Sequence, residues 1–186
     1  MVKNIIEGKF IKLGNFEEEF FKIIVENQWD IKFFRPLSWD TFHPYTIEDW
    51  KNFVGDSDTN SRFLFAIINK ESKEFIGWTS LSDIQFKNRV ADLSMAILKE
   101  DNRNRGLGKD ALNVILNFAF YELGLHKVKL SVHSNNIPAI KLYSSAGFVK
   151  EGTDREALFQ DGNWLDVYYY GIIDSEWVNK TQISKQ

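Results

Sequence analysis

Apolar positions recur at helical spacing in one long stretch of the chain, from residue 107 to residue 123. Its apolar side chains fall on one helical face: Leu107, Ala111, Leu112, Ile115, Leu116, Ala119 and Leu123. Gly106 and Gly108 lie at its start in a basic, polar turn, and Gly124 follows its end. Because glycine readily adopts the left-handed conformation that ends helices, the pattern predicts a glycine turn followed by a long helix that stops at Gly124.

Alternating or continuous apolar runs elsewhere predict the strands. We expect them at residues 10–13, 63–68, 75–80, 91–98, 127–132, 148–154 and 165–173, with the turn Asp161-Gly162 in the loop between the last two. Helical spacing and end signals predict further helices at about residues 15–25, 46–55 and 136–147. This mixed order predicts an α+β fold, an α/β sandwich with helices on both faces of a mixed, mainly antiparallel sheet of about seven strands.

Composition restricts the class of protein. The chain has 186 residues, 44% of them apolar and 26% charged, so we expect one globular domain over residues 1–186, with a core at about 9–175 and a polar C-terminal tail at 176–186. A net charge of −3 does not favour nucleic acid as a partner. The sequence shows neither an apolar run of membrane length nor a signal-peptide pattern.

The residues that usually ligate metals are sparse. Cysteine is absent, which excludes disulfides, cysteine-based metal sites and a cysteine nucleophile, and is compatible with the cytoplasmic location that we expect. His43, His126 and His133 are scattered without metal-ligand spacing. We interpret each histidine as a surface or loop residue and expect no metal site.

The turn before the long helix is suited to phosphate. Arg103 and Arg105 add full positive charges to the partial charge of a helix N-terminus, where backbone N–H groups lack partners. A Walker loop is excluded, because Asp110 follows Gly108-Lys109 where Ser or Thr is required. A dinucleotide fingerprint fits the glycine spacing, but it requires glycines directly after a strand and an acid at the end of the next strand, and neither is present.

The third interpretation is a resemblance to the acetyl-coenzyme A loop of the GNAT N-acetyltransferases, Arg/Gln-x-x-Gly-x-Gly/Ala, which Arg103, Gly106 and Gly108 match. A second stretch resembles the other signature of that family, Asn-x-x-Ala-x-x-x-Tyr-x-x-x-Gly-Phe, beginning at Asn136 and ending at Phe148. The two stretches lie in the family's order, separated by a helix and a strand. The resemblance extends from about residue 9 to about residue 175 and is strongest to the ribosomal-protein N-terminal acetyltransferases and the spermidine acetyltransferases.

The resemblance implies that acetyl-CoA is a co-substrate and that no metal takes part. In this family the strand before the glycine loop and the strand after its helix diverge at one end, and the pantetheine arm of the cofactor lies in the gap. It therefore implies these cofactor-binding residues: Ala96, Ile97, Leu98, Arg103, Asn104, Arg105, Gly106, Leu107, Gly108, Lys109, Asn136, Ala139 and Tyr143.

The resemblance also implies two catalytic residues. Tyr143 is the family's proton donor to the departing thiolate, although a tyrosine here could also be a core aromatic beside Ile140. Asp92 is the candidate base that takes a proton from the amine, with a plain surface carboxylate as the alternative. The spacing from Asp92 to Arg103 is one residue longer than is usual in this branch. With no cysteine for an acyl-enzyme, direct attack in a ternary complex is favoured.

Residues 27–45 are aromatic, contain two prolines and show no clean period, so we expect a loop with a short helical piece. This segment is either a hydrophobic flap over the core or a wall of the acceptor site, for which the candidates are Trp29, Phe33, Phe34 and Trp39. Acidic residues in and beside it would suit a polyamine: Asp30, Asp40, Glu48 and Asp49.

The acceptor itself is left open between a small amine, such as a polyamine, and a protein N-terminus. An acetyl-CoA-binding sensor or regulatory module without turnover is the alternative from another class. Many relatives dimerise, so we also expect a homodimer or a higher homo-oligomer.

Overall fold

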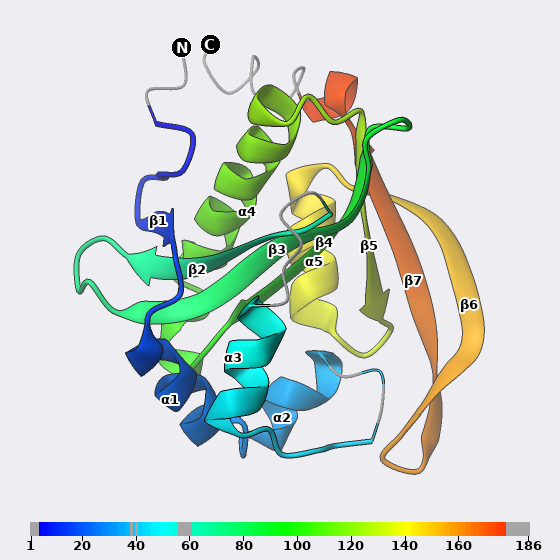
Figure 1. Ribbon diagram of the computed structural model, residues 1–186. Helices are drawn as coiled ribbons and strands as arrows, with labels where there is room; N and C mark the ends of the chain where they lie inside the picture. The colour runs from blue at the N-terminus through cyan, green and yellow to red at the C-terminus, as the bar shows by residue number, and fades with distance from the viewer. Residues whose placement is uncertain (1–3, 38, 40, 56–60, 178–186) are drawn as a thin grey trace.

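The computed structural model describes residues 4–37, 39, 41–55 and 61–177, and its strands form one mixed sheet (Figure 1). The sheet order is β1-β2-β3-β4-β5-β7-β6. The strands are β1 (Ile11–Gly14), β2 (Phe63–Asn69), β3 (Phe75–Gln85), β4 (Val90–Ile97), β5 (Lys127–His133), β6 (Val149–Gln160) and β7 (Asn163–Ile173). Within the described residues β4 and β5 are the one parallel pair, and every other neighbouring pair is antiparallel.

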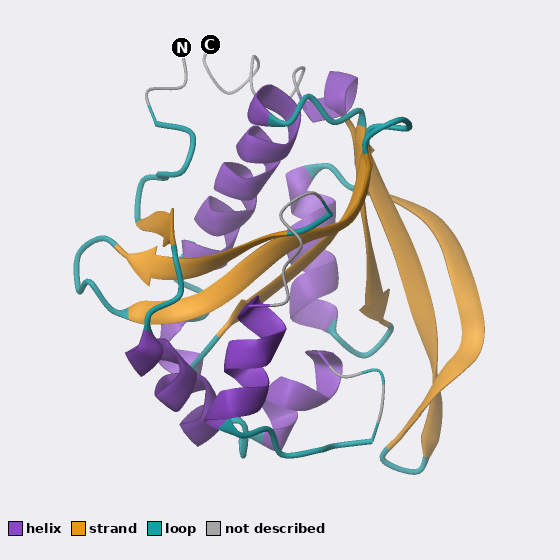
Figure 2. Ribbon diagram, in the orientation of Figure 1, coloured by secondary structure: helices purple, strands orange, loops and turns teal. Residues whose placement is uncertain are grey.

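The helices cover both faces of this sheet (Figure 2). They are α1 (Glu18–Asn27), α2 (Ile31–Phe34), α3 (Ile47–Gly55), α4 (Leu107–Asn117) and α5 (Ile137–Ala146). Apolar residues of α4 and α5 form a core with one face of the sheet, whereas those of α1 to α3 pack in a second cluster that includes Ala66, Trp78 and Ala96. The predicted fold class is confirmed. Side chains along β4 alternate between the two faces of the sheet, because Leu93 and Ala96 lie in different core clusters.

The two central strands separate part-way along their length. Pairing between β4 and β5 covers three positions and ends at Asp92 with Lys129. Beyond that point β4 stays bonded to β3 as far as Ile97, while β5 stays bonded to β7 as far as His133. Both strands therefore leave one edge without a partner strand, and they diverge as the family resemblance implies.

The predicted ends of the elements are confirmed where side chains or glycines set them. Thr46 and Asp49 exchange hydrogen bonds at the start of α3, since the Asp49 N–H donates to Thr46 Oγ1 (3.2 Å) and the Thr46 N–H donates to Asp49 Oδ2 (2.7 Å). The Asn136 side chain accepts from the Ala139 N–H at the start of α5. Gly124 and Gly147 have φ of 62° and 98°, the left-handed conformation expected just after a helix.

Three elements differ from the predictions. The long helix is α-helical only to Asn117 and continues as a π-helical turn, Phe118–Glu122, in which three consecutive residues are buried. Strand β3 runs on to Gln85, and β6 runs to Gln160 rather than residue 154. Strand β6 lies at the edge of the sheet, where it pairs with β7 through backbone hydrogen bonds with two register shifts. Because most of its side chains are exposed, its sequence shows no apolar alternation.

Two further expectations concern segments that are only partly described. Residues 178–186 of the polar tail predicted at 176–186 lie outside the described residues, whereas Trp177 is 2% exposed and packs in the main core, so the core extends into the start of the predicted tail. The division into a single domain stays a prediction. In the part of the chain that the structure describes, no helix combines the length and apolar character needed to cross a bilayer.

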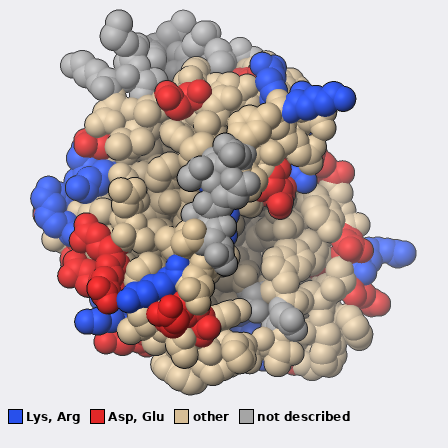
Figure 3. Space-filling view, in the orientation of Figure 1, with Lys and Arg blue, Asp and Glu red and all other residues tan. Residues whose placement is uncertain are grey.

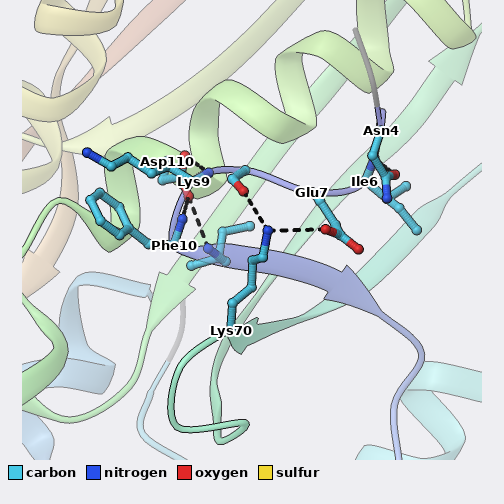
Figure 4. A network of polar contacts seen from close by, with 9 residues as sticks. Asn4, Ile6, Glu7, Lys9, Phe10, Lys70 and Asp110 are labelled. Atoms are coloured by element: carbon cyan, nitrogen blue, oxygen red, sulfur yellow. Dashed lines mark hydrogen bonds and ion pairs between the residues drawn. The ribbon is translucent and has the colours of Figure 1, made fainter.

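The first turn of α4 is tied to the segment that precedes β1 (Figure 4). The Asp110 carboxylate accepts the backbone N–H groups of Lys9 (3.0 Å), Phe10 (2.6 Å) and Ile11 (3.0 Å). Lys70 Nζ holds the same segment by donating to Glu7 Oε2 and to the Gly8 carbonyl, both at 3.1 Å. Asp110 thereby fixes the start of α4, where the glycine turn lies, against the edge of the sheet.

Substituting Asp110→Asn should destabilise the fold by about 1–3 kcal/mol, because an amide donor then faces backbone donors in place of a charged acceptor. Denaturant unfolding of both proteins measures this change. Asp154→Asn is the matched control, since the Asp154 side chain is exposed and should change stability by no more than about 0.5 kcal/mol. Equal effects of the two substitutions would show that the Asp110 contacts add nothing.

Candidate active site

Two connected cavities lie where β4 and β5 diverge. The aromatic cavity, of about 410 Å³, is walled by α3, by the segment around Trp39 and by the separated strand ends. The loop cavity, of about 460 Å³, lies over the glycine turn and the start of α4. The two cavities share seven lining residues: Pro36, Leu37, Met95, Ala96, Asn136, Ala139 and Tyr143.

The glycine turn lines the loop cavity with groups suited to an anion. Gly106 has φ of 81° and begins α4 without a side-chain cap, so the first N–H groups of the helix are left for a ligand. Of the predicted cofactor-binding residues, the following line this cavity: Ala96, Ile97, Arg103, Asn104, Gly106, Gly108, Lys109, Asn136, Ala139 and Tyr143.

Arg103 is held in place but retains donor capacity. Its guanidinium lies 4.7 Å from the Phe33 ring centroid, and its Nε donates to the Ile97 carbonyl at 3.4 Å. Its Nη2 is buried with no partner. Because a buried charged donor without an acceptor is costly, this atom indicates a ligand that supplies one, and the phosphate groups of coenzyme A fit that requirement.

Other predicted cofactor residues lie elsewhere. Leu107 is buried in the main core, and Arg105 is exposed and outside the lining of either cavity. Leu98 is 1% exposed in the second core cluster, and its N–H donates to the Ile76 carbonyl at 2.8 Å. The Leu98 N–H is therefore already engaged, which argues against its use as a donor to a bound thioester.

Tyr143 lies where the two cavities meet. It is 7% exposed, and its ring packs against Phe148 at 5.7 Å between centroids. Burial raises the pKa of Tyr143 to about 12, so the phenol stays protonated at neutral pH. Tyr143 packs in the core, as one of its two interpretations from the sequence required, and it also lines both cavities. Its role as a proton donor stays a prediction.

Asp92 is not brought to either cavity. Its carboxylate pairs with Lys129 Nζ at 3.0 Å, at the last position where β4 and β5 are bonded. The side chain is 33% exposed, and the ion pair faces partly into solvent. The predicted role of Asp92 as a base therefore has no support from its position.

The aromatic segment contributes to both cavities. Phe34 and Trp39 line the aromatic cavity, Phe33 lies in the loop cavity against Arg103, and Trp29 is 62% exposed and lines neither. The expected short helical piece is confirmed as α2, followed by a 3₁₀ turn at Arg35–Leu37.

One of the predicted acids lies in the wall of the aromatic cavity. Asp49 is exposed there, and hydrogen bonds from the Thr46 hydroxyl and N–H hold the pKa of its carboxyl below the usual value. Asp30 instead caps α2 by accepting from the Phe33 N–H, and Glu48 lines neither cavity. Asp40 lies outside the described residues.

His133 is a cavity residue that the sequence interpretation missed. It is 1% exposed at the end of β5, so its assignment to the surface or a loop is wrong. The sequence signal that could have identified it as a cavity residue was its place at the end of a strand, directly before the motif that begins at Asn136.

The described residues contain no group of three or more side chains suited to a metal ion. On the face shown in Figure 3, Lys and Arg side chains are interspersed with Asp and Glu.

Comparison with known proteins agrees with this geometry. The family model described as "Acetyltransferase (GNAT) domain" matches residues 18–169. This chain belongs to the GNAT acetyltransferase family. The resemblance found in its two motifs is confirmed, and the chain is an N-acetyltransferase by family.

Individual relatives give the same picture. The chain is 31% identical over 116 residues to the spermidine N(1)-acetyltransferase of Vibrio cholerae, an alignment that covers 62% of this chain and just under two thirds (66%) of that protein. It is 27% identical over 165 residues to the putative ribosomal N-acetyltransferase YdaF of Bacillus subtilis, covering 86% of this chain and 87% of the relative. A crystal structure of the Vibrio cholerae spermidine N-acetyltransferase with CoA and spermine superposes with a TM-score of 0.80 at 24% identity, covering 91% of this chain and 98% of that one, which shows the shared fold.

Substituting Arg103→Ala should weaken CoA binding by about 10- to 100-fold, because a buried charged donor is lost. Isothermal titration calorimetry with CoA measures this effect. Arg105→Ala is the matched control, since it removes the same charge two residues away and should change affinity by less than about 3-fold. Equal losses for both variants would mean that the turn acts through its overall charge alone.

Proposed function

We propose that this protein transfers the acetyl group of acetyl-CoA to the primary amine of a small cationic acceptor, by direct attack in a ternary complex. The observation that carries the proposal is the junction of the two cavities at Tyr143, between separated strands. A cofactor entering from the glycine turn and an amine entering from the aromatic cavity would meet there.

On the cofactor side, Arg103 and the free N–H groups at the start of α4 hold the phosphates. Ala96 and Ile97 supply the unpaired edge of β4 for the pantetheine arm, with Asn136 and Ala139 opposite. In this arrangement the thioester would lie beside Tyr143. Acetyl-CoA supplies the activated acetyl group, and the chain supplies position and charge.

Tyr143 donates a hydrogen bond to the departing sulfur. A phenol pKa of about 12 lies above the value of about 8.5 for an ordinary thiol, so complete proton transfer to a free thiolate is uphill. A hydrogen bond to the developing negative charge lowers the barrier without that cost. The raised pKa also keeps Tyr143 available as a donor throughout the neutral range.

The aromatic cavity suits a cationic amine. Trp39, Tyr45 and Trp50 present ring systems that attract ammonium groups, and Asp49 adds a carboxylate that stays ionised at neutral pH. Relatives named for spermidine lead to the same class of acceptor. We therefore favour a polyamine over a protein N-terminus as the acceptor.

Substituting Tyr143→Phe should lower kcat by about 10²- to 10³-fold and leave CoA affinity within about 3-fold, because only the donor to the sulfur is lost. Free-thiol release from acetyl-CoA with spermidine measures turnover, and calorimetry measures CoA binding. If neither wild type nor variant released thiol while both bound CoA, the alternative of a binding module without turnover would hold.

Substituting Asp49→Asn should raise KM for 1,5-diaminopentane by about 10-fold, because the distal ammonium loses its carboxylate partner. Pentylamine, which has the same chain without the second amine, is the matched acceptor, and its KM should stay within about 2-fold. A similar rise for both amines would show that Asp49 supports the cavity wall and does not select cations.

The finer predictions remain proposals. We propose a homodimer or higher homo-oligomer on the basis of the family resemblance alone. The proposed cytoplasmic location and the proposed absence of a metal rest on composition, since the chain lacks cysteine and its three histidines are scattered. The proposal of a single domain rests on chain length and composition.

A further inference from the structure

His133 is a buried ionisable group that the chemistry described so far does not use. It lies in the wall of the aromatic cavity, as does Tyr143, and only 1% of it is exposed. Its Nδ1 is buried without a hydrogen-bond partner. Buried polar atoms in folded proteins are nearly always paired, so the unpaired nitrogen of a residue that lines a cavity leaves the imidazole free to take a partner from a bound ligand.

The surroundings of His133 keep the imidazole neutral. The Trp39 ring meets it edge-on, at 5.0 Å between centroids and 89° between planes, and its neighbour on β7 is Val167. Burial lowers the pKa of His133 below its usual value. Among the residues that the structure describes, the other titratable groups lining the same cavity are Tyr45 and Asp49 on the side of the aromatic segment and α3, and Tyr143 on α5. None of these contacts is an ion pair that would charge the imidazole.

Acetyl transfer requires a proton acceptor at this place. When the amine nitrogen attacks the thioester carbonyl, a nitrogen–carbon bond forms and the nitrogen becomes positively charged and strongly acidic. It must lose one proton before the carbon–sulfur bond breaks, or the amine leaves again. A neutral imidazole can accept such a proton, because its unprotonated nitrogen carries a free lone pair.

We propose that His133 accepts the proton that the attacking amine loses during acetyl transfer. The proposal rests on the acetyltransferase function proposed above. The form that attacks is the free amine, which has already lost its ammonium proton to water. In this step the nitrogen–carbon bond forms, one remaining proton on the nitrogen passes to the imidazole, and the carbon–sulfur electron pair passes to the sulfur, which Tyr143 stabilises. The imidazolium then releases its proton to water, and the products are the N-acetyl amine and CoA.

Two carboxylates, those of Asp92 and Asp49, are less well placed than His133 to accept this proton. Asp92 is engaged with Lys129 at 3.0 Å and lines neither cavity. Asp49 does line the aromatic cavity, but its carboxylate already accepts hydrogen bonds from the Thr46 N–H and hydroxyl, both at 2.7 Å. His133 combines a place in the cavity wall, an unpaired nitrogen and a neutral ground state.

The test is the pH profile of kcat/KM for wild type, His133→Asn and Asp92→Asn, with acetyl-CoA and spermidine. The wild-type profile should fall as the pH drops through an ionisation below about 6.5, because the imidazole becomes protonated there. His133→Asn should lose this limb and lower kcat by about 10²-fold or more, with CoA affinity by calorimetry unchanged. His133→Ala should regain part of its turnover when imidazole is added, which a purely structural role would not allow.

Four results would overturn the proposal. Turnover within about 3-fold of wild type in His133→Asn, or an acidic limb that persists in it, would exclude His133 as the acceptor. Loss of that limb in Asp92→Asn but not in His133→Asn would assign the proton to Asp92. If the wild type itself released no thiol with any amine, the proposed function would fail together with this role, whereas active His133→Asn overturns the role of His133 alone.

Discussion

The site exists because β4 and β5 stay bonded for only three positions. Up to Asp92 and Lys129 they form an ordinary parallel pair inside the sheet. Past that point each strand is held from its outer side, β4 by β3 and β5 by β7, so the gap between them stays open without either strand unfolding. A sheet that closed here would leave no edge for a cofactor arm and no route from the glycine turn to the aromatic cavity.

The surrounding elements keep that gap in a defined shape. The Asp110 carboxylate fixes the start of α4 against the segment before β1, and Phe33 supports the Arg103 guanidinium from the acceptor side. Because α2 therefore contacts the cofactor loop, the segment that walls the acceptor cavity also orders the anion-binding turn. Tyr143 lies at the junction on α5 as a protonated phenol, and His133 lies in the wall of the aromatic cavity at the end of β5, where burial lowers the pKa of its imidazole.

Short-range patterns in the sequence predicted the features that depend on a few neighbouring residues. The turn around Gly106, the cap formed by Thr46 and Asp49, and the start of α5 at Asn136 follow from local hydrogen bonding and backbone preference. The family resemblance supplied the divergence of the strands, which no local pattern carries, since pairing of β4 with β5 joins residues more than thirty positions apart.

Features set by packing between distant segments were missed, because no local pattern in the sequence carries them. The burial of His133 depends on the segment around Trp39, almost a hundred residues earlier, and the placement of Phe33 depends on Arg103. Asp92 was favoured by its place on a strand, but an ion pair to the neighbouring strand holds it away from the cavities. The end of β6 gave no apolar signal because that edge strand is mostly exposed.

The most direct test of this account is free-thiol release from acetyl-CoA by the wild-type protein, with and without spermidine. The account predicts release that requires both the protein and the amine, because the open gap brings thioester and acceptor together at Tyr143. A protein that leaves acetyl-CoA intact with spermidine, with other small amines and with peptide N-termini would contradict it.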